Sequence, residues 1–261
     1  DQASFALPLY LTPARFYLLP KVHKSGVPGR PVISASGSLT ENLSDLVDFM
    51  IKDFVPMIPS HLRDTFDFLE KVRGLGQVPP GAILVTVDVV ALYPSIPHDL
   101  GIASLSDFLS ARGVRREKVR GICDMAEFVL KNNVFEFNSQ LYLQTSGTAI
   151  GTKMAPSYAN IVMAEFEQRV LNRCDFRPHA YWRFIDDIFM VWTHGVDKLN
   201  DFLNLLNSEN SALKFTSEHS KCVNFLDVRV TISESDTITT DIYYKETDSH
   251  QYLDPSSCHP H

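Results

Sequence analysis

Two adjacent carboxylates interrupt an otherwise apolar segment of the chain. Asp186 and Asp187 lie within residues 181–192, a pattern that predicts strand, turn and strand with both acids at the exposed tip. Neighbouring carboxylates raise each other's pKa, and a divalent cation removes that cost. Oxygen ligands on a rigid hairpin suit Mg²⁺, which takes one or two carboxylates and completes its shell with water and phosphate. The alternative is an ordinary Asp-Asp turn.

A third carboxylate ends a buried strand. Residues 82–87 are rich in β-formers without polar alternation, which is typical of a strand buried on both faces, and Asp88 follows directly. Asp88 could simply cap the next segment. Together with Asp186 and Asp187, it would complete a three-carboxylate site for two Mg²⁺ ions, one activating an attacking hydroxyl and the other stabilising a leaving pyrophosphate.

Two loops add candidate binding groups. Residues 21–31 place basic side chains on a loop shaped by Gly and Pro, which predicts either a triphosphate clamp or a solvated surface loop. Residues 147–160 resemble a P-loop, but the glycine spacing is one residue short and Met154 follows Lys153, which excludes an NTPase of that kind. A glycine-rich loop that opens a helix of small residues instead favours close packing against a ligand such as a stacked base pair.

The pattern of elements predicts a single α+β domain. Helices and antiparallel strands follow one another without βαβ regularity, and there is no internal repeat or low-complexity linker. The predicted helices cover residues 41–55, 62–72, 100–111, 116–131, 156–174 and 196–206. The predicted strands, besides those above, cover about 16–19, 31–35, 134–137, 141–144, 213–217, 225–232 and 238–244.

The charge and the apolar pattern limit the partners. A net charge of −7 excludes a protein that is basic throughout and coats nucleic acid, but it allows a local basic channel. Residues 201–261 carry −6 of this total, whereas residues 1–40 carry +3. No apolar run approaches the roughly 18 residues of a membrane span. The first twenty residues do not read as a signal peptide, and four widely spaced cysteines favour free thiols. We therefore expect an intracellular protein that is not secreted and has no membrane partner.

The order of these motifs resembles that of reverse transcriptases: a basic loop ending in Arg-Pro, an Asp-containing strand with Tyr93 five residues on, a Gly-rich loop with its helix, and an x-Asp-Asp hairpin. The local sequence is similar to the Penelope-like retroelement branch, in FYLLPKVHK (16–24), LYPSIP (92–97), GTAIG (147–151), NFLDV (224–228), YKETDSHQYL (244–253) and SSCHP (256–260). The resemblance implies the fingers and palm of a right-hand polymerase, with an antiparallel palm sheet packed on helices. It implies one domain over residues 1–261, with fingers at about 1–80 and 100–145 and palm at about 81–99 and 146–261.

The resemblance also implies an activity and roles. A primer 3′-OH would attack a dNTP under two-metal catalysis, with Mg²⁺, or Mn²⁺ in its place, bound by Asp88, Asp186, Asp187 and the carbonyl of Val89. Lys21 and Arg30 would hold the triphosphate, Tyr93 would exclude a ribose 2′-OH by steric clash, and Gly151 would let the backbone approach nucleotide and template. Lys24, Phe225 and Leu226 would contact primer and template. Lys214 or Lys221 would donate a proton to pyrophosphate.

Some features depart from the family pattern. Ile150 stands where many relatives have Gln, Phe184 stands where retroviral enzymes have Tyr, and the chain stops where a thumb would begin. The expected partners are an RNA template, a DNA or RNA primer and dNTPs, in the nucleus, with a C-terminal thumb and an endonuclease domain in the full-length protein. Two alternatives stay open: a retroelement-derived nucleic-acid-binding domain without productive polymerase activity, and a palm polymerase that synthesises RNA.

Overall fold

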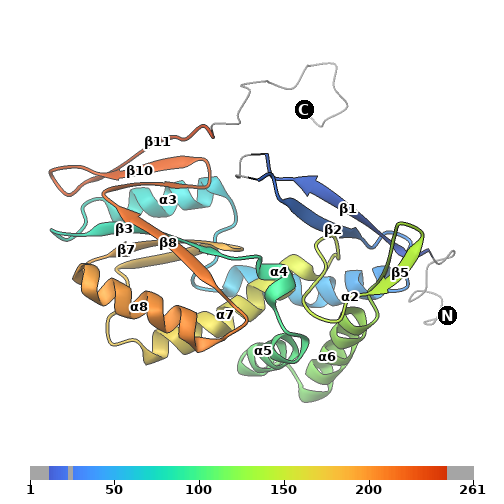
Figure 1. Cartoon of the computed structure of the whole chain (residues 1–261). Helices are drawn as coiled ribbons and strands as arrows, with labels where there is room; N and C mark the ends of the chain where they lie inside the picture. The colour runs from blue at the N-terminus through green and yellow to red at the C-terminus, as the bar shows by residue number, and fades with distance from the viewer. Residues whose placement is uncertain (1–11, 23–25, 246–261) are drawn as a thin grey trace.

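A four-stranded outer sheet forms one side of the molecule (Figure 1). The computed structural model describes residues 12–22 and 26–245. In the outer sheet, β1 (Ala14–Pro20) pairs with β2 (Gly29–Ser34) as an antiparallel hairpin and with β4 (Val134–Phe137) in parallel, and β5 (Gln140–Leu143) closes the order β2-β1-β4-β5. The β4–β5 hairpin turns at Asn138 and Ser139, both with positive φ, which matches the twist of a two-residue hairpin. The outer sheet therefore joins segments about a hundred residues apart.

A second sheet, the central sheet, has the order β6-β7-β3-β8 and is antiparallel throughout. Its strands are β6 (Ala180–Phe184), β7 (Asp187–Trp192), β3 (Ile83–Val89) and β8 (Phe215–Ser220). Beside it lies a small sheet of order β11-β10-β9, made of β9 (Cys222–Phe225), β10 (Val228–Ile232) and β11 (Ile238–Ile242). Asp88 pairs directly with Asp187 in the central sheet, so that register brings two predicted site residues together.

The two faces of the central sheet bury different clusters, because successive side chains of a strand point to opposite faces. Val85 and Val87 enter a core with Phe166 of helix α7 (Ala155–Arg173) and Phe202 of helix α8 (Gly195–Glu209). On the opposite face Leu84 packs in a second core. That core contains Phe68 of helix α3 (Thr65–Leu75) and Phe225 of the small sheet. Asp88 has the parity of Leu84 and therefore projects on this second face.

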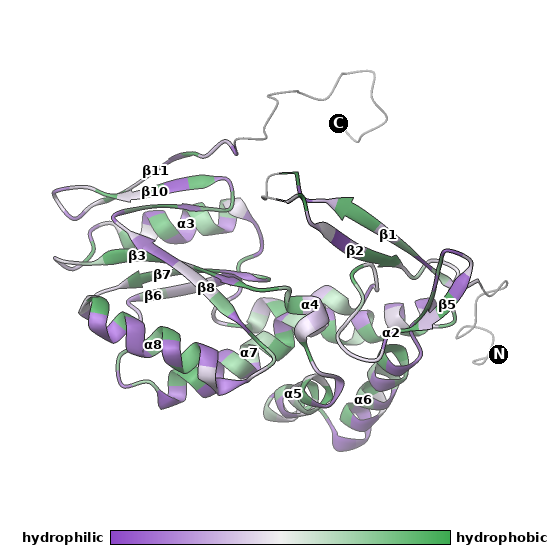
Figure 2. Cartoon of the chain, in the orientation of Figure 1, coloured by the Kyte–Doolittle hydropathy of each residue, from purple (hydrophilic) through white to green (hydrophobic). Residues whose placement is uncertain are grey.

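The remaining helices are α2 (Glu41–Ile51), the 3-10 helix η1 (Lys52–Met57), the short α4 (Leu92–Ser95), α5 (His98–Ala111) and α6 (Arg116–Lys131). In Figure 1 they lie on the side of the outer sheet, with α5 and α6 below it and α4 between it and the central sheet. Figure 2 shows hydrophilic residues on the outer sides of α6 and α8 and hydrophobic residues turned toward the interior. Helix α3 belongs to the predicted fingers segment 1–80, yet its apolar face packs on the central sheet. None of the helices in the described ranges is long and apolar enough to span a bilayer.

Two of the predicted elements are wrong in detail. The strand expected over residues 225–232 is a hairpin, because β9 ends at Phe225, β10 begins at Val228, and these two residues pair across a two-residue turn. The helix expected over residues 41–55 changes to a 3-10 helix after Ile51. Pro56 lies in that stretch and has no N–H to donate to an α-helical hydrogen bond.

Candidate active site

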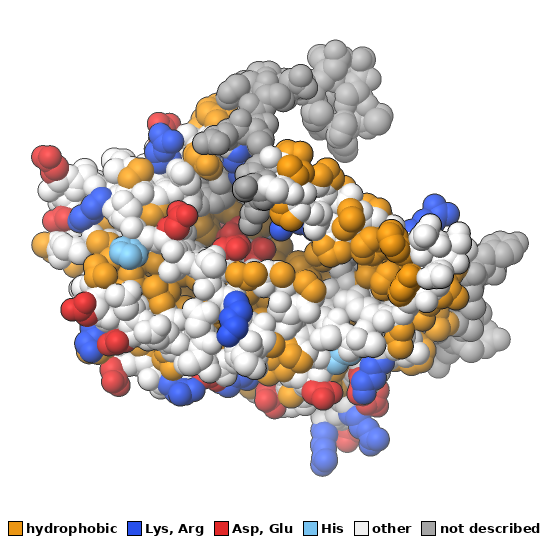
Figure 3. All heavy atoms as spheres, viewed as in Figure 1, with side chains coloured by type: hydrophobic (Ala, Val, Ile, Leu, Met, Phe, Trp, Pro, Cys, Tyr) orange, Lys and Arg blue, Asp and Glu red, His pale blue; other side chains and the backbone are white. Residues whose placement is uncertain are grey.

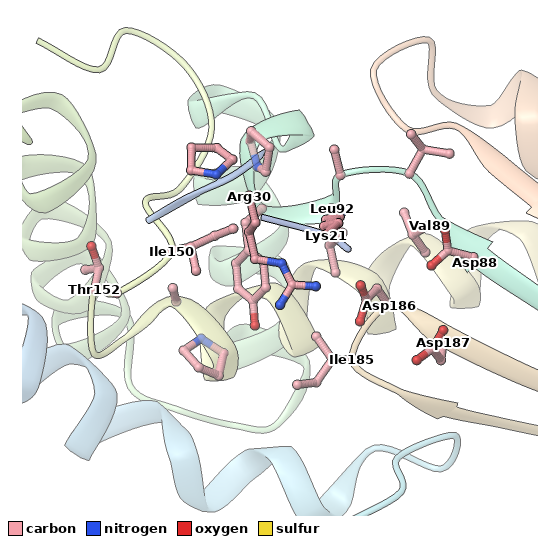
Figure 4. Close-up of a pocket in the computed structure, with 18 of the residues that line it drawn as sticks. Lys21, Arg30, Asp88, Val89, Leu92, Ile150, Thr152, Ile185, Asp186 and Asp187 are labelled. Carbon is pink, nitrogen blue, oxygen red and sulfur yellow. The ribbon is translucent and has the colours of Figure 1, made fainter. Parts of the chain in front are cut away.

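A cavity of about 900 Å³ lies between the outer sheet, the loop before α7 and the ends of β3 and β7. Figure 3 shows acidic side chains at the floor of the hollow between the two halves of the molecule. Figure 4 shows the carboxylates from the central sheet on one side and basic side chains from the outer sheet on the other. The cavity gathers eight of the residues predicted for the site, namely Lys21, Arg30, Asp88, Val89, Tyr93, Gly151, Asp186 and Asp187.

The three carboxylates come from two neighbouring strands and the turn between β6 and β7. Asp88 and Asp187 are cross-strand neighbours, which places their Cβ atoms on one face of the sheet. Asp186 lies in the turn, and its carbonyl accepts a hydrogen bond from the Val89 amide at 3.0 Å. Burial, followed by the charges of Asp186 and Asp88, raises the pKa of Asp187 to about 6. Burial also raises the pKa of Asp186, against the opposing pull of Arg30 and Lys21.

The turn itself has an unusual backbone. Phe184 pairs with Asp187, so Ile185 and Asp186 form a two-residue hairpin turn. Ile185 has φ +54°, in the left-handed region that a β-branched residue rarely adopts. The predicted turn at Asp186 and Asp187 is therefore shifted by one residue, and Asp187 is the first residue of β7.

The donor set fits hard divalent cations. Crowded carboxylates with raised pKa values mark a place where positive charge is favourable, and the Val89 carbonyl on the adjoining strand adds a neutral oxygen. Within the described part of the chain, no group of three or more His, Cys, Asp or Glu side chains forms a ready metal cage. Mg²⁺ is usually bound by one or two carboxylates and completes its shell with water or phosphate. Asp88, Asp186 and Asp187 would hold it, with Val89 as the predicted backbone ligand.

Tyr93 is held by the loop that contains Gly151. The Thr148 amide donates to the Tyr93 carbonyl at 2.7 Å, and the Ile33 amide of β2 donates to the Ile150 carbonyl at 2.7 Å. Burial, then the Asp186 charge, raises the pKa of Tyr93 to about 12, so its hydroxyl stays protonated at neutral pH. The loop therefore ties Tyr93 in α4 to a strand of the outer sheet.

Gly151 is required by protein packing as well as by the cavity. It has φ +116°, and a Cβ there would lie 2.4 Å from the Ile33 carbonyl oxygen. The sequence pattern predicted that this glycine makes room for nucleotide and template. In the structure the atoms that leave no space for a side chain belong to β2, while Gly151 also lines the cavity.

The basic side of the cavity comes from the β1–β2 hairpin. Lys21 and Arg30 line it, and their positive charges oppose the rise that burial causes in the pKa of Asp186. Lys24 lies outside the described residues, as do the sequence motifs after residue 245. Lys153 also lines the cavity, a placement that sequence reasoning missed, and forms an ion pair with Asp45 at 3.3 Å.

A second cavity of about 300 Å³ adjoins Asp88 and Asp187 and is also lined by Phe225 and Leu226. Leu226 has φ +53° in the β9–β10 turn. The Phe225 ring is 3% exposed and packs between Phe68 and Phe189, at centroid distances of 4.7 and 5.5 Å. A primer in this cavity would therefore meet the backbone at 225 rather than its ring.

The resemblance implies that either Lys214 or Lys221 donates a proton to pyrophosphate, and the two lysines lie in different places. The Lys214 carbonyl accepts from the Val90 amide, at the carboxylate end of the central sheet. Lys221 follows β8 at the opposite end, where Ser220 pairs with Leu84. Lys214 is therefore the one beside the segment that bears Asp88.

The sequence did not predict that Arg183 supports the turn between β6 and β7. Arg183 is fully buried and forms an ion pair with Glu167 of α7 at 2.6 Å. The available signal was a charged residue inside a strand whose neighbours are apolar, because a buried charge needs a partner. The partner could not be found from the sequence, since Glu167 looks like any polar residue of an amphipathic helix.

A family model described as reverse transcriptase (RNA-dependent DNA polymerase) matches residues 23–253. No curated protein sequence gives a match.

Solved structures of polymerases share the fold. An apo telomerase from Candida tropicalis, truncated from its C-terminal domain, matches with a TM-score of 0.65 and 10% identity, over 90% of this chain and 55% of that one. A telomerase from Candida albicans in complex with a fragment of telomeric RNA matches with a TM-score of 0.64 and 11% identity, over 89% and 46%. The RNA-dependent RNA polymerase of a human picobirnavirus matches with a TM-score of 0.63 and 10% identity, over 88% of this chain and 47% of that one.

The chain spans about half the length of these structures. The likeness shows an α+β fold of the polymerase fingers and palm type. Because the family model matches most of the length of this chain, the chain belongs to the reverse transcriptase (RNA-dependent DNA polymerase) family.

Proposed function

We propose that the chain is the fingers and palm part of an RNA-directed DNA polymerase that adds dNTPs to a primer 3′-OH. The observation that carries the proposal is one cavity in which three carboxylates of the central sheet face Lys21 and Arg30 of the outer sheet. Negative groups on one wall and positive groups on the other suit a metal-bound triphosphate. The family membership supports polymerase chemistry rather than another use of such a cavity.

Each wall has a distinct task in this proposal. Bound Mg²⁺ would supply Lewis-acid activation of the primer hydroxyl and neutralise charge on the leaving pyrophosphate. Arg30 presents a planar fork that suits phosphate oxygens, and Lys21 adds a second positive charge beside it. Tyr93, fixed through its carbonyl by Thr148, would lie against the sugar and reject a 2′-OH by contact. The last point favours deoxynucleotides over ribonucleotides.

The finer assignment within the family is part of the proposal. The local sequence similarity supports a Penelope-like retroelement enzyme. The template would be RNA and the primer DNA or RNA, and the parent protein would add a thumb and an endonuclease domain and work in the nucleus. Telomerase structures that carry telomeric RNA show that this fold can accompany an RNA partner.

Asp186→Asn tests the activity. The substitution keeps the size of the side chain but removes the charge, and we expect Mg²⁺-dependent primer extension to fall by at least about a thousandfold with the fold intact. Extension is measured with dNTPs and with NTPs, on RNA and DNA templates, in Mg²⁺ and in EDTA. Asp201→Asn, on the exposed side of α8, is the matched control and keeps full activity.

The alternatives predict different results. A binding domain without polymerase activity would bind primer–template equally well with and without the substitution and extend in neither case. An RNA-synthesising polymerase would incorporate ribonucleotides at least as well as deoxynucleotides. Full extension by the Asp186→Asn variant would contradict the proposal.

A further inference from the structure

Arg183 ties helix α7 to the turn that bears the carboxylates. Its guanidinium donates from Nε to Glu167 Oε1 at 2.6 Å, from Nη1 to Asn160 Oδ1 at 2.7 Å, and from Nη2 to the Asn160 carbonyl at 3.1 Å. Nη1 also donates to the Ile185 carbonyl at 3.0 Å. Four of the donor contacts open to one guanidinium are therefore used, and one of them lies in the turn.

Glu167 is satisfied as completely as its partner. It is 4% exposed and accepts hydrogen bonds from the Ser60 hydroxyl at 2.6 Å and the Tyr181 hydroxyl at 3.1 Å, besides that from Arg183. The Arg183 amide donates to the Ser60 carbonyl, and the Arg183 carbonyl accepts from the Leu62 amide. Three segments distant in sequence thus meet around one buried ion pair, and a fully satisfied polar network of this kind fixes its members rigidly.

Stability alone does not account for this arrangement. A buried ion pair loses roughly as much hydration as it gains in attraction, and an apolar pair of similar volume would fill the same space. An apolar side chain could not donate to the Ile185 carbonyl. Ile185 needs such a partner, because its left-handed backbone persists only where the surrounding structure holds it.

The turn at Ile185 and Asp186 fixes the positions of the carboxylates. Asp186 follows Ile185 directly, and its carbonyl is bound by the Val89 amide of β3. Asp187, the next residue, pairs with Asp88. We infer that Arg183 is a positioning residue: together with Glu167 and Asn160 it holds the Ile185–Asp186 turn in the conformation that directs Asp186 and Asp187 toward Asp88. The inference rests on the proposed function in that these carboxylates are taken as metal ligands.

Arg183→Lys is the principal test. Lysine keeps the charge opposite Glu167, but one ammonium cannot span Glu167, Asn160 and the turn as the planar fork does. We expect the Val89 amide, and peptides over residues 185–187, to exchange hydrogen at least tenfold faster, while the interior of α7 keeps its protection. We expect Mn²⁺ binding, followed by electron paramagnetic resonance, to weaken about tenfold. In primer extension, kcat should fall at least thirtyfold, with KM for dNTP changed less than threefold.

Two further variants separate positioning from stability. Glu167→Gln removes a buried charge but leaves the guanidinium against the turn, so it should destabilise the fold more than Arg183→Lys while raising Val89 exchange and weakening Mn²⁺ only about threefold. Glu209→Gln is the matched control, because Glu209 lies near the far end of α7 and pairs with Arg169 and Arg173 there. It should leave Val89 exchange, Mn²⁺ affinity and extension unchanged.

The outcomes distinguish this inference from the proposed function. If the wild type fails to extend primers, the proposed function fails, while hydrogen exchange at Val89 still decides the role of Arg183. If Arg183→Lys does not fold, a local rise in exchange at Val89 in Glu167→Gln supports the inference. Protection of Val89 that is unchanged in these variants, or that changes only as much as global stability, overturns it, as does an effect of equal size in Glu209→Gln.

Discussion

At the residue scale, the surroundings of Asp187 disfavour the ionised form of its carboxyl group. Burial is the first cause of its raised pKa, and the charges of Asp186 and Asp88 add to it, while Lys245 opposes it. The folded protein thus holds a proton on Asp187 at a pH where the unfolded chain has released it. Without metal, the free energy of unfolding should therefore decrease as pH rises from the usual carboxyl range toward about 6, and then level off.

Asp187→Asn should remove this penalty. In EDTA at pH 7, we expect the variant to be more stable than the wild type by on the order of 1 kcal/mol, allowing for solvent screening at a partly exposed group. Urea unfolding at pH 4, 6 and 7 measures the difference, which should vanish at the lowest pH. Added Mg²⁺ should stabilise the wild type and leave the variant unchanged. A variant that is less stable than the wild type at pH 7 in EDTA would show that the carboxylate is favourably placed even without metal.

The same scale shows what could be predicted. Lys21, Arg30, Tyr93 and the carboxylates lie in one cavity, as motif order and residue chemistry suggested. The reasons for Gly151 and Arg183 could not be predicted, because they depend on the neighbours that the fold supplies. Ile33, the neighbour of Gly151, lies more than a hundred residues before it in the sequence. Glu167, the partner of Arg183, lies on a different element.

At the scale of elements, the long and strongly periodic segments could be predicted, whereas one tight turn was predicted one residue away from its position and another was missed. Helices α5, α6 and α7 and strand β3 lie within a few residues of their expected bounds. The turns at Ile185 and Leu226 place residues other than Gly or Asn at positive φ, so no local signal marks these two residues as the left-handed positions. At both turns the tertiary context overrides the local preference. Ile185 borders the first cavity and Leu226 borders the second.

Gly151→Ala tests the loop as an element. The new Cβ meets the Ile33 carbonyl oxygen in a backbone region that suits only glycine, so we expect a loss of at least about 2 kcal/mol of stability and a higher KM for dNTP as β2 and Arg30 move. Thermal unfolding and extension kinetics measure both. Gly121→Ala is the control, because nothing lies near that position in α6, and helix propensity should make it neutral or slightly stabilising. Equal stability of the two variants would contradict the packing role of Gly151.

The whole molecule is acidic, yet its cavity is not. Lys21, Arg30 and Lys153 line the cavity, and the charge of Lys245 acts on Asp187, whereas the exposed basic side chains of α6 lie away from the hollow (Figure 3). Such a molecule can neutralise only a few phosphates. Nucleic-acid affinity should therefore be modest and depend only moderately on salt.

A salt titration checks this distribution. We expect log K for primer–template binding to fall with log salt at a slope between about −2 and −4, which corresponds to a few neutralised phosphates. The triple variant Arg116→Gln, Lys118→Gln, Arg120→Gln should leave that slope within about one unit of the wild type. A slope that becomes much shallower would show that α6 is part of the nucleic-acid interface.

The loop over residues 147–151 has a mechanical consequence for the whole molecule. Gly147 lies so close to Pro94 that a Cβ would be 2.4 Å from its carbonyl oxygen, and Gly151 lies equally close to Ile33. Because the loop is packed tightly against α4 at one end and against β2 at the other, we expect it to move as a rigid unit. A displacement of strand β2 toward or away from the carboxylates should therefore also move the short helix that carries Tyr93. In the polymerase proposed above, the entry of a nucleotide would then be coupled to the contact between Tyr93 and the sugar.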